Sequence, residues 1–374
     1  MLRKKTLGLI FANMHDSSIG DMTAKRSMAS LPFGGRYRMI DFGLSALVHA
    51  GVTKVGVIAK NNYHSLMDHL GSGRQWDLSR KRGGLSIFPP HRYFEETESL
   101  YHGRIQALYN VLPYIKNSDV GYVVMMDCDF VCNIDISAVL EHHANTNADV
   151  TIVCCESAND ADICKDCVSI KKDDTGRARE IFMNKALDDG VLSMDVFVIA
   201  KEMLISLIED AMTNMYRYFE KDILADKIDT LNIQCYMHDR FARRIYCTKS
   251  YYDANMSLLD YNNLSDLFTP NRPIYTKVRD EAPVRYGVAS SVKNSLLADG
   301  CVVEGHVENC VLFRGVKIEA GATVKNSILM QNSVVKTNAS LNCVITDKDV
   351  VISQDRTLEG DTNYPLYVKK SSVV

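Results

Sequence analysis

Short apolar runs alternate with helix-like segments along the first two thirds of the chain. Residues Thr53–Ala59, Gly121–Met126 and Asp149–Cys154 are nearly continuous apolar runs, which suit strands covered on both faces of a mostly parallel sheet. The segments between them, such as Ile40–Ala50 and Ile105–Ile115, carry apolar residues at helical spacing. This alternation predicts an α/β fold with a doubly wound, mostly parallel sheet.

The end of the chain follows a different period. Asparagines recur 15, 17 and 16 residues apart, at Asn294, Asn309, Asn326 and Asn342. Nine positions after each comes an aliphatic residue, namely Val303, Ile318, Val335 and Val351. A fixed period with short β-branched runs and no room for helices predicts stacked coils, a parallel β-helix with the asparagines in a ladder. The alternative is a four-stranded antiparallel sheet, although hairpins would not repeat the residue types in one order.

These two patterns divide the chain into parts. We predict an α/β domain over residues 1–255, a linker over 256–285 that contains Pro270, Pro273 and Pro283, and a β-helix over 286–374. A chain of 374 residues has length for about two domains.

Composition excludes several classes of function. The net charge of −3 provides no basic field for nucleic acid, and no apolar run approaches the roughly 20 residues that span a bilayer. We interpret the apolar run after the basic start as a first buried strand rather than a secretion signal.

With eleven scattered cysteines, an odd number, we expect reduced thiols in a cytoplasmic protein. The single CxxC, Cys164–Cys167, lacks the second pair that a zinc site needs, so we expect a surface turn.

A set of segments spread over most of the chain points to one family. They are Leu31–Phe42, Gln75–Leu78, Arg80–Gly84 with Pro89–Pro90, Tyr101–Gly103, Lys221–Asp222 and Tyr251–Met256. Together they resemble the ADP-glucose pyrophosphorylase family, also called glucose-1-phosphate adenylyltransferase. The resemblance implies a nucleotidyltransferase-like α/β domain followed by a left-handed parallel β-helix. It also implies transfer of a nucleotidyl group to a sugar phosphate, which requires that phosphate charge be positioned and neutralised.

The phosphate-binding loop of that family is altered here. The family has a glycine-rich loop after its first strand, because glycines let backbone N–H groups approach phosphate oxygens. Aligned on Ala12–Thr23, its glycines fall on Asn13, Met14 and Asp16, and its arginine falls on Ser18. Asp16 would add negative charge beside a triphosphate. We therefore expect an ordinary turn in place of a phosphate loop.

The metal-binding carboxylates are altered as well. The family holds Mg²⁺ with two aspartates, since magnesium prefers hard oxygen ligands. The first matches Asp129, but the second falls on Arg244, where a cation opposes metal binding. Asp127 is a second acid nearby, yet in a strand it would point to the face opposite Asp129. We therefore expect no metal site and a vestigial Asp129.

The sugar-phosphate positions are partly kept. Alignment leaves Lys185 and Ser193 as substrate-binding candidates, while Asn184 replaces a family glutamate and Asp195 stands at a family glycine. A family Gly-Thr-Ala-Asp phrase falls on Gly103–Gln106, which removes another acid. A family lysine falls on Met28, and Arg26 remains.

Because the altered positions are catalytic and the framing segments match, the resemblance implies a regulatory subunit of glycogen synthesis. Such a subunit pairs with a catalytic subunit, and Mg²⁺ and ATP bind productively only in that partner. We expect the chain to form a hetero- or homo-oligomer. The cluster of Arg26, Arg36 and Arg38 is a candidate site for a sugar-phosphate effector; the alternative is that these arginines are solvated charges or form interface ion pairs. One alternative is an altered-specificity nucleotidyltransferase. Another is a β-helix acyltransferase with His306, the one histidine of the repeats, as its base.

Overall fold

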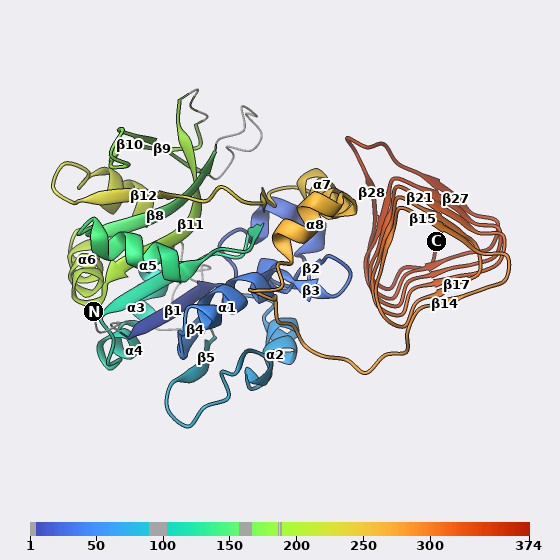
Figure 1. Cartoon of the computed structure of the whole chain (residues 1–374), viewed down its shortest axis with the longest axis horizontal. Helices are drawn as coiled ribbons and strands as arrows, with labels where there is room; N and C mark the ends of the chain where they lie inside the picture. The colour runs from blue at the N-terminus through green and yellow to red at the C-terminus, as the bar shows by residue number, and fades with distance from the viewer. Residues whose placement is uncertain (1–4, 90–102, 157–166, 186, 188) are drawn as a thin grey trace.

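Two regions lie side by side in the computed structural model, a layered α/β domain and a prism of stacked coils (Figure 1). The structure describes residues 5–89, 103–156, 167–185, 187 and 189–374. Pro90, Tyr101, His102 and Cys164, which belong to motifs discussed above, lie outside these residues. None of the helices in the described ranges has the length and apolar character needed to cross a membrane.

A nine-stranded sheet forms the centre of the α/β domain, in the order β10-β9-β11-β6-β1-β4-β5, with β8 paired to β11 and β12 paired to β8. Strands β6, β1, β4 and β5 are parallel to one another, so the predicted doubly wound arrangement is confirmed. Strand β11 runs antiparallel to β6, β8 and β9, which isolated apolar runs do not reveal. The strands are β1 (Thr6–Phe11), β4 (Lys54–Ile58), β5 (Gly84–Phe88), β6 (Tyr122–Met126), β8 (Val150–Glu156), β9 (Val168–Lys172), β10 (Ala178–Met183), β11 (Val191–Ala200) and β12 (Ile233–Met237).

Both faces of this sheet are covered, which explains why its strands are apolar throughout. In β6, Val123 and Met125 enter the core on one face, and Val124 and Met126 enter the core on the other. The first core also contains residues of α3, α4 and α6, and the second contains residues of α1 and α5. The helices are α1 (Met39–His49), α2 (His64–Leu70), α3 (Arg104–Asn110), α4 (Leu112–Lys116), α5 (Ile136–Asn145), α6 (Lys201–Thr213), α7 (Thr248–Met256) and α8 (Tyr261–Leu267).

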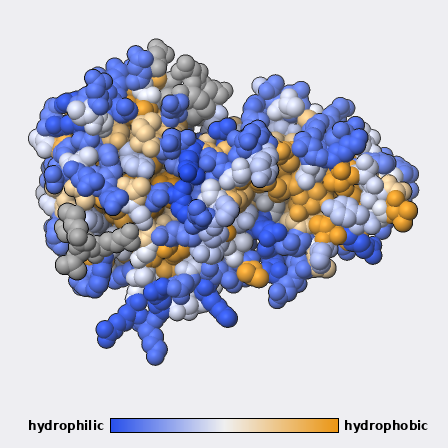
Figure 2. Space-filling view, viewed as in Figure 1, coloured by the Kyte–Doolittle hydropathy of each residue, from blue (hydrophilic) through white to orange (hydrophobic). Residues whose placement is uncertain are grey.

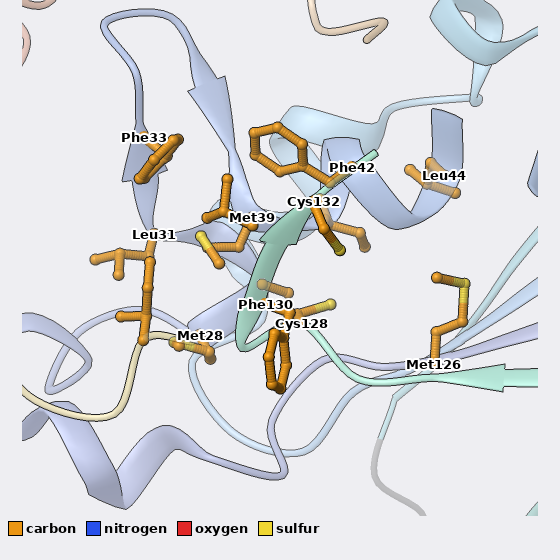
Figure 3. Packing of buried hydrophobic residues seen from close by; sticks show 14 of the residues in the cluster. Met28, Leu31, Phe33, Met39, Phe42, Leu44, Met126, Cys128, Phe130 and Cys132 are labelled. Carbon is orange, nitrogen blue, oxygen red and sulfur yellow. The ribbon is translucent and has the colours of Figure 1, made fainter. Parts of the chain in front are cut away.

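Short elements complete the domain around the carboxyl ends of β1 and β6. Figure 3 shows Met28, Leu31 and Phe33 from one segment gathered with Phe130 and Cys132 from another, so the Leu31–Phe42 frame packs against the chain that follows β6. The short strands are β2 (Pro32–Phe33), β3 (Tyr37–Arg38), β7 (Phe130–Cys132) and β13 (Ala242–Arg244). Short 3₁₀ helices cover Asp16–Met22, Met28–Ser30, Arg74–Trp76 and Ser257–Leu259, and a π-type helix covers Phe219–Ala225.

The C-terminal region is a three-sided prism, seen nearly along its axis in Figure 1. Each side is a five-stranded sheet of parallel strands, so the coil prediction is confirmed and the antiparallel alternative is wrong. One side holds β14 (Arg285–Tyr286), β17 (Val302–Val303), β20 (Lys317–Ile318), β23 (Val334–Val335) and β26 (Val351–Ile352). The second holds β15 (Ser291–Lys293), β18 (His306–Glu308), β21 (Thr323–Lys325), β24 (Ser340–Asn342) and β27 (Thr357–Glu359). The third holds β16 (Leu296–Leu297), β19 (Val311–Leu312), β22 (Ile328–Leu329), β25 (Val344–Thr346) and β28 (Leu366–Val368).

The predicted asparagine ladder is confirmed at one corner of the prism. The amide of Asn294 donates to the carbonyl oxygen of Asn309 at 2.8 Å, and the bonds continue to Asn326 and Asn342 at 3.2 and 3.0 Å. The fourth repeat is shifted by one residue, because Cys343 takes the left-handed φ that the first three asparagines adopt. In this repeat Ile352, and not the Val351 of the fixed spacing, pairs with Val335 and is buried.

The two regions share one apolar core and buried polar contacts. Val311, Phe313 and Ile328 of the prism belong to the same cluster as the α/β residues Leu31 and Tyr251. The Tyr252 hydroxyl donates to the Asn326 carbonyl at 2.6 Å. Arg26 donates to both oxygens of Asp347 at 2.6 and 2.8 Å, and both side chains are almost fully buried. The β-helix is therefore fastened to the α/β domain.

The stretch between the domains is only partly a linker. Leu258 and Leu267, from the helices Ser257–Leu259 and α8, are buried against the α/β core. The chain outside regular structure therefore runs from residue 268 to β14, rather than over all of the predicted 256–285. The predicted segment was too long because its polar composition concealed a short helix.

Removal of the Arg26 guanidinium should destabilise the protein strongly. In an Arg26→Leu variant the Asp347 carboxylate stays buried without its cation, which costs about 3 kcal/mol or more. Urea unfolding at neutral pH measures this loss. The matched control is Arg36→Leu, whose pair with Asp299 is more than one-third exposed and is worth about 1 kcal/mol or less. Equal losses in the two variants would contradict the assignment of Asp347–Arg26 as the main polar link between domains.

Candidate functional site

The loop after β1 lies at the carboxyl ends of the parallel strands, where α/β sheets bind their ligands. Its residues are held by the chain itself. The Asn13 side chain accepts from the Lys60 N–H at 2.8 Å and donates to the Asn61 carbonyl at 3.0 Å. The Asp16 carboxylate accepts from the Met28 N–H at 2.6 Å. Asp16, singled out above as a repulsive charge, is thus bound within its own loop, and burial raises its pKa.

His15 is the residue of this loop that reaches the acidic residues after β6. Its Nε2 lies 2.9 Å from Asp127 Oδ2, 3.8 Å from Asp129 Oδ2 and 3.7 Å from Asp195 Oδ2. Burial by itself would lower the pKa of His15, but the three carboxylates outweigh burial and raise this pKa to about 9. His15 is therefore a cation at neutral pH.

Two buried arginines meet the same acidic residues. Arg104 donates to Asp127 at 2.6 and 3.0 Å and to Glu220 at 2.8 Å, and its guanidinium lies 4.8 Å from the ring centre of Phe11. Arg244 donates through Nε to Asp129 Oδ2 at 2.9 Å. Both arginines are at least nine-tenths buried. Buried carboxylates are stable only when such cations and hydrogen bonds compensate them.

The charges of this cluster balance without any added ion. Burial, with Asp129 and Asp127 nearby, raises the pKa of Asp195 to about 8, so Asp195 holds a proton at neutral pH. Three carboxylates then remain, those of Asp127, Asp129 and Glu220, against the cations His15, Arg104 and Arg244. We call these seven residues the internal ion network.

Mg²⁺ does not fit this arrangement. His15, Asp129 and Asp195 each have a potential ligand atom, and these three atoms lie within 4.8 Å of one another. The Oδ1 atom of Asp129 is buried with no hydrogen bond. However, Arg244 donates to the other oxygen of Asp129. His15 is protonated at neutral pH, so its ring nitrogens have no free lone pair for a metal. Magnesium also prefers oxygen ligands and retained waters. Two guanidinium groups and an imidazolium therefore repel the ion that the family would place here.

The expectation that Asp127 and Asp129 point to opposite faces is wrong. Strand β6 ends at Met126 and β7 begins at Phe130, so the two aspartates lie in a turn. Strand alternation does not apply there, and both carboxylates come within 4 Å of His15.

The sugar-phosphate candidates lie in different environments. Lys185 is exposed, with its ammonium 4.7 Å from the ring centre of Phe182. Ser193 is buried, and its hydroxyl accepts from the Asp195 N–H at 3.1 Å. Asp195 has a φ of 52° at an irregularity of β11, a conformation that suits the glycine of the family. Ser193 thus supports the turn that places Asp195 in the network.

The three arginines proposed for an effector all have partners within the chain. Arg26 binds Asp347, Arg36 binds Asp299 at 3.1 Å, and Arg38 donates to Ser65 at 2.7 and 2.8 Å. Two of them therefore form the ion pairs between domains that the sequence left as an alternative. Arg26, Arg38 and Lys348 nevertheless form a basic cluster. Burial and the charges of Arg38 and Arg26 lower the pKa of Lys348 to about 7.

His306 lies outside the internal ion network. His306 is exposed and lines a shallow depression of about 310 Å³ on the outer face of β15, β18 and β21. Cys167 is buried beside Ser169, and the rest of the surface turn expected over Cys164–Cys167 lies outside the described residues.

Sequence reasoning missed His15, Arg104, Asp195 and Glu220 as members of one site. A signal was present, because acids and bases replace the family residues at several positions together. Asp195 replaces a glycine, Arg104 replaces a threonine and Arg244 replaces an aspartate. The compensation between the new positive and negative charges becomes apparent only when these substitutions are considered together.

Comparison with known proteins agrees with these two regions. A family model described as nucleotidyl transferase matches residues 18–260, and one described as GlmU-like, C-terminal hexapeptide matches residues 280–364. The glycogen biosynthesis protein GlgD of Bacillus subtilis is 36% identical over 374 residues, which cover 100% of this chain and 98% of the relative. GlgD of Geobacillus stearothermophilus is 36% identical over 86% of this chain and 84% of its own length. A glucose-1-phosphate adenylyltransferase of Halalkalibacterium halodurans is 32% identical over 86% of this chain and 85% of its own length.

The internal ion network predicts a stability that falls as pH rises. The folded-state pKa of His15, about 9, exceeds its ordinary value of 6.5, so the stabilisation is complete below pH 6.5 and is lost as pH rises through 9. Asp195 contributes in the same direction up to about pH 8. Each proton involved gives a slope of up to about 1.4 kcal/mol per pH unit. Urea unfolding of wild type and His15→Gln between pH 6.5 and 9.5 should show a weaker slope in the variant.

The matched control for this measurement is His306→Gln, an exposed histidine outside the network. That variant should keep the wild-type slope. An unchanged slope in His15→Gln would mean that His15 is not protonated in the folded protein.

Proposed function

This chain belongs to the ADP-glucose pyrophosphorylase family of nucleotidyl transferases, and we propose that it is a catalytically silent, regulatory subunit of a glucose-1-phosphate adenylyltransferase. The pathway is glycogen biosynthesis, in which its GlgD relatives take part by name. The reaction of the whole enzyme converts ATP and glucose 1-phosphate to ADP-glucose and pyrophosphate.

The internal ion network is the observation that carries this proposal. Nucleotidyl transfer brings two anions together, and an active site must offer them uncompensated positive charge or a metal. Here the cations His15, Arg104 and Arg244 are already bound to the chain's own carboxylates. A triphosphate would have to displace buried ion pairs, each of which is costly to break. Mg²⁺ and ATP then bind productively only in the catalytic partner.

Regulation requires that the chain communicate with that partner and with an effector. The basic cluster of Arg26, Arg38 and Lys348 lies where the β-helix meets the α/β domain. Arg36 forms a second ion pair between the domains, with Asp299. A sugar phosphate bound there would compete with Asp347 for Arg26 and so alter the contact between domains. That competition gives a physical route from effector to assembly.

A weakly active transferase of altered specificity is the second candidate. One observation favours it, namely that Asp129 keeps an unpaired buried oxygen while Lys185 and Ser193 are retained. An enzyme of this kind would have to recruit a metal against the two arginines. Activity measurements separate the two candidates directly.

The purified chain should release pyrophosphate from ATP and glucose 1-phosphate at a background rate. Its melting temperature should not respond to Mg²⁺ with ATP, because the internal ion network excludes both. A coupled pyrophosphate assay and a thermal shift titration test this. A turnover near the enzyme median of about 10 s⁻¹ would refute a silent subunit.

Restoration of the family charges should recover metal binding. In a His15→Gly/Arg244→Asp variant two cations are removed and the second carboxylate returns beside Asp129, so Mg²⁺ or Mn²⁺ should raise the melting temperature. The matched control is His15→Gly/Arg243→Asp, because Arg243 is the exposed neighbour of Arg244. The same metal response in both variants would show that general negative charge, and not the network, governs binding.

Mixing this chain with a catalytic adenylyltransferase subunit from the same organism should give a heteromer. The partner's apparent affinity for substrate or effector should change by about 5- to 150-fold, which corresponds to a coupling of 1–3 kcal/mol. Size exclusion with light scattering and steady-state kinetics measure the two effects. Separate elution and unchanged kinetics at micromolar concentration would leave the altered-specificity enzyme as the better candidate.

A further inference from the structure

A cavity of about 380 Å³ lies beside the amino ends of β4 and β5. It is enclosed by the end of α1, the 3₁₀ helix Arg74–Trp76 and the chain that leads from the α/β domain to the β-helix. Strands β6, β1, β4 and β5 are parallel, so this cavity and the internal ion network lie at opposite ends of the strands. A volume of this size is within the range of sites for small molecules.

Aromatic rings form part of the cavity wall. Tyr275 is 39% exposed, and its ring centre lies 5.2 Å from that of His49, which also lines the cavity. Trp76 lines the cavity from the core side, with its edge packed against His69 at 5.8 Å between ring centres. The indole Nε1 of Trp76 is buried and has no acceptor among the described residues. An unpaired buried N–H is costly, and a ligand with a hydrogen-bond acceptor would remove that cost.

The polar side chains of the wall leave one cation without a partner. Arg80 donates to the side chain and the carbonyl of Asp77, so these two charges compensate each other. In the part of the chain that the structure describes, no hydrogen bond or ion pair holds the side chain of Arg74 or of Gln75. The guanidinium of Arg74 is therefore available to an anion from solution.

The surroundings of the cavity are basic. The loop that follows carries the exposed Arg80, Lys81 and Arg82, and Asp77 is the one acid between Arg74 and β5. Figure 2 shows hydrophilic side chains extending from the lower end of the α/β domain, where β5 and α2 lie in Figure 1. An excess of one charge around a concave site raises the local concentration of the opposite charge.

We propose that this cavity binds a small organic anion, a carboxylate or a phosphate that carries a planar ring. The Arg74 guanidinium pairs with the anionic group, for which its planar fork of donors is suited. The ring of the ligand lies against Tyr275, and acceptors on the ligand receive hydrogen bonds from Trp76 Nε1 and the Gln75 amide. This site is separate from the internal ion network and does not depend on the proposed regulatory role.

A ligand in this cavity would also hold the chain between the two domains. Tyr275 belongs to that chain, and its N–H donates to the Ser45 hydroxyl of α1 at 2.9 Å. Two residues later, the Lys277 carbonyl accepts from Arg314 of the β-helix at 3.2 Å. A ligand that contacts both Tyr275 and Arg74 therefore joins the connecting chain more firmly to the α/β domain. The backbone amide of Tyr275 should exchange hydrogen more slowly when the cavity is filled.

The test uses the fluorescence of Trp76, which is the only tryptophan of the chain. The full chain is titrated with phenyl phosphate and with benzoate, which combine a ring with the two kinds of anion. Inorganic phosphate lacks the ring, and benzyl alcohol lacks the charge. At least one of the ringed anions should give a saturable change in fluorescence, and the two partial ligands should bind at least about tenfold more weakly. The tighter of the two ringed anions identifies the preferred anionic group.

Two variants separate the contributions to binding. Arg74→Gln alters an exposed side chain and should weaken the ringed anion at least about tenfold, to the level of benzyl alcohol. Tyr275→Ala should remove the preference for the ringed anion over inorganic phosphate. The matched control is Arg285→Gln, an exposed arginine of the β-helix whose loss should leave binding unchanged.

Two results would overturn the proposal. One is the lack of saturable binding of both ringed anions to wild type, in fluorescence and in ligand-observed NMR. The other is equal affinity of wild type and Arg74→Gln for the ringed anion. Neither result bears on catalytic silence, which the pyrophosphate assay tests separately.

Discussion

Three buried acidic side chains, those of Asp127, Asp129 and Asp195, lie within 4 Å of the imidazole of His15. Charge of one sign cannot be gathered in such a place unless protons or cations compensate it. This chain supplies the cations from three separate elements, the loop after β1, the start of α3 and strand β13. The network therefore ties the loop, the helix and the strand into one structure. A chain that performs nucleotidyl transfer must leave the same position free for charge that arrives with the substrates.

The framing segments have a structural reason to persist whether or not catalysis does. Residues Leu31–Phe42 pack on one side against the chain after β6, and Gly35 approaches Leu296 and Ala298 of the first coil. Tyr251 donates to the Pro32 carbonyl at 2.7 Å, and Tyr252 reaches the β-helix. These residues build the junction between the domains. Similarity in the frame thus reports on the fold, and the differences at Arg104, Asp195 and Arg244 report on chemistry.

Substitutions at the site and retention of the junction fit a chain whose role lies in assembly. The α/β domain keeps its buried polar link to the prism through Arg26 and Asp347, and this link lies beside a basic cluster. An effector, the domain junction and a subunit contact can then act on one another through packed elements, as a coupling between sites requires.

The sequence by itself determined the fold class, the coil repeat and the altered family positions. Hydrophobic periodicity and repeat spacing arise between near neighbours in the chain, so they can be read without a structure. Alignment with the family also identified Arg244 opposite Asp129, and the structure places them 2.9 Å apart. The repeat spacing put the aliphatic position of the fourth repeat at Val351, but a local change of conformation moves it to Ile352.

Only the tertiary structure decided that the site is filled from within. His15 is one polar residue in a turn until the 3₁₀ fold of the loop directs it at residues more than 110 positions away. Asp127 and Asp129 face the same centre because a turn replaces the strand there, and Arg26 meets Asp347 across 321 residues. Charge compensation depends on distance in space, and sequence separation carries no information about that distance until the chain has folded.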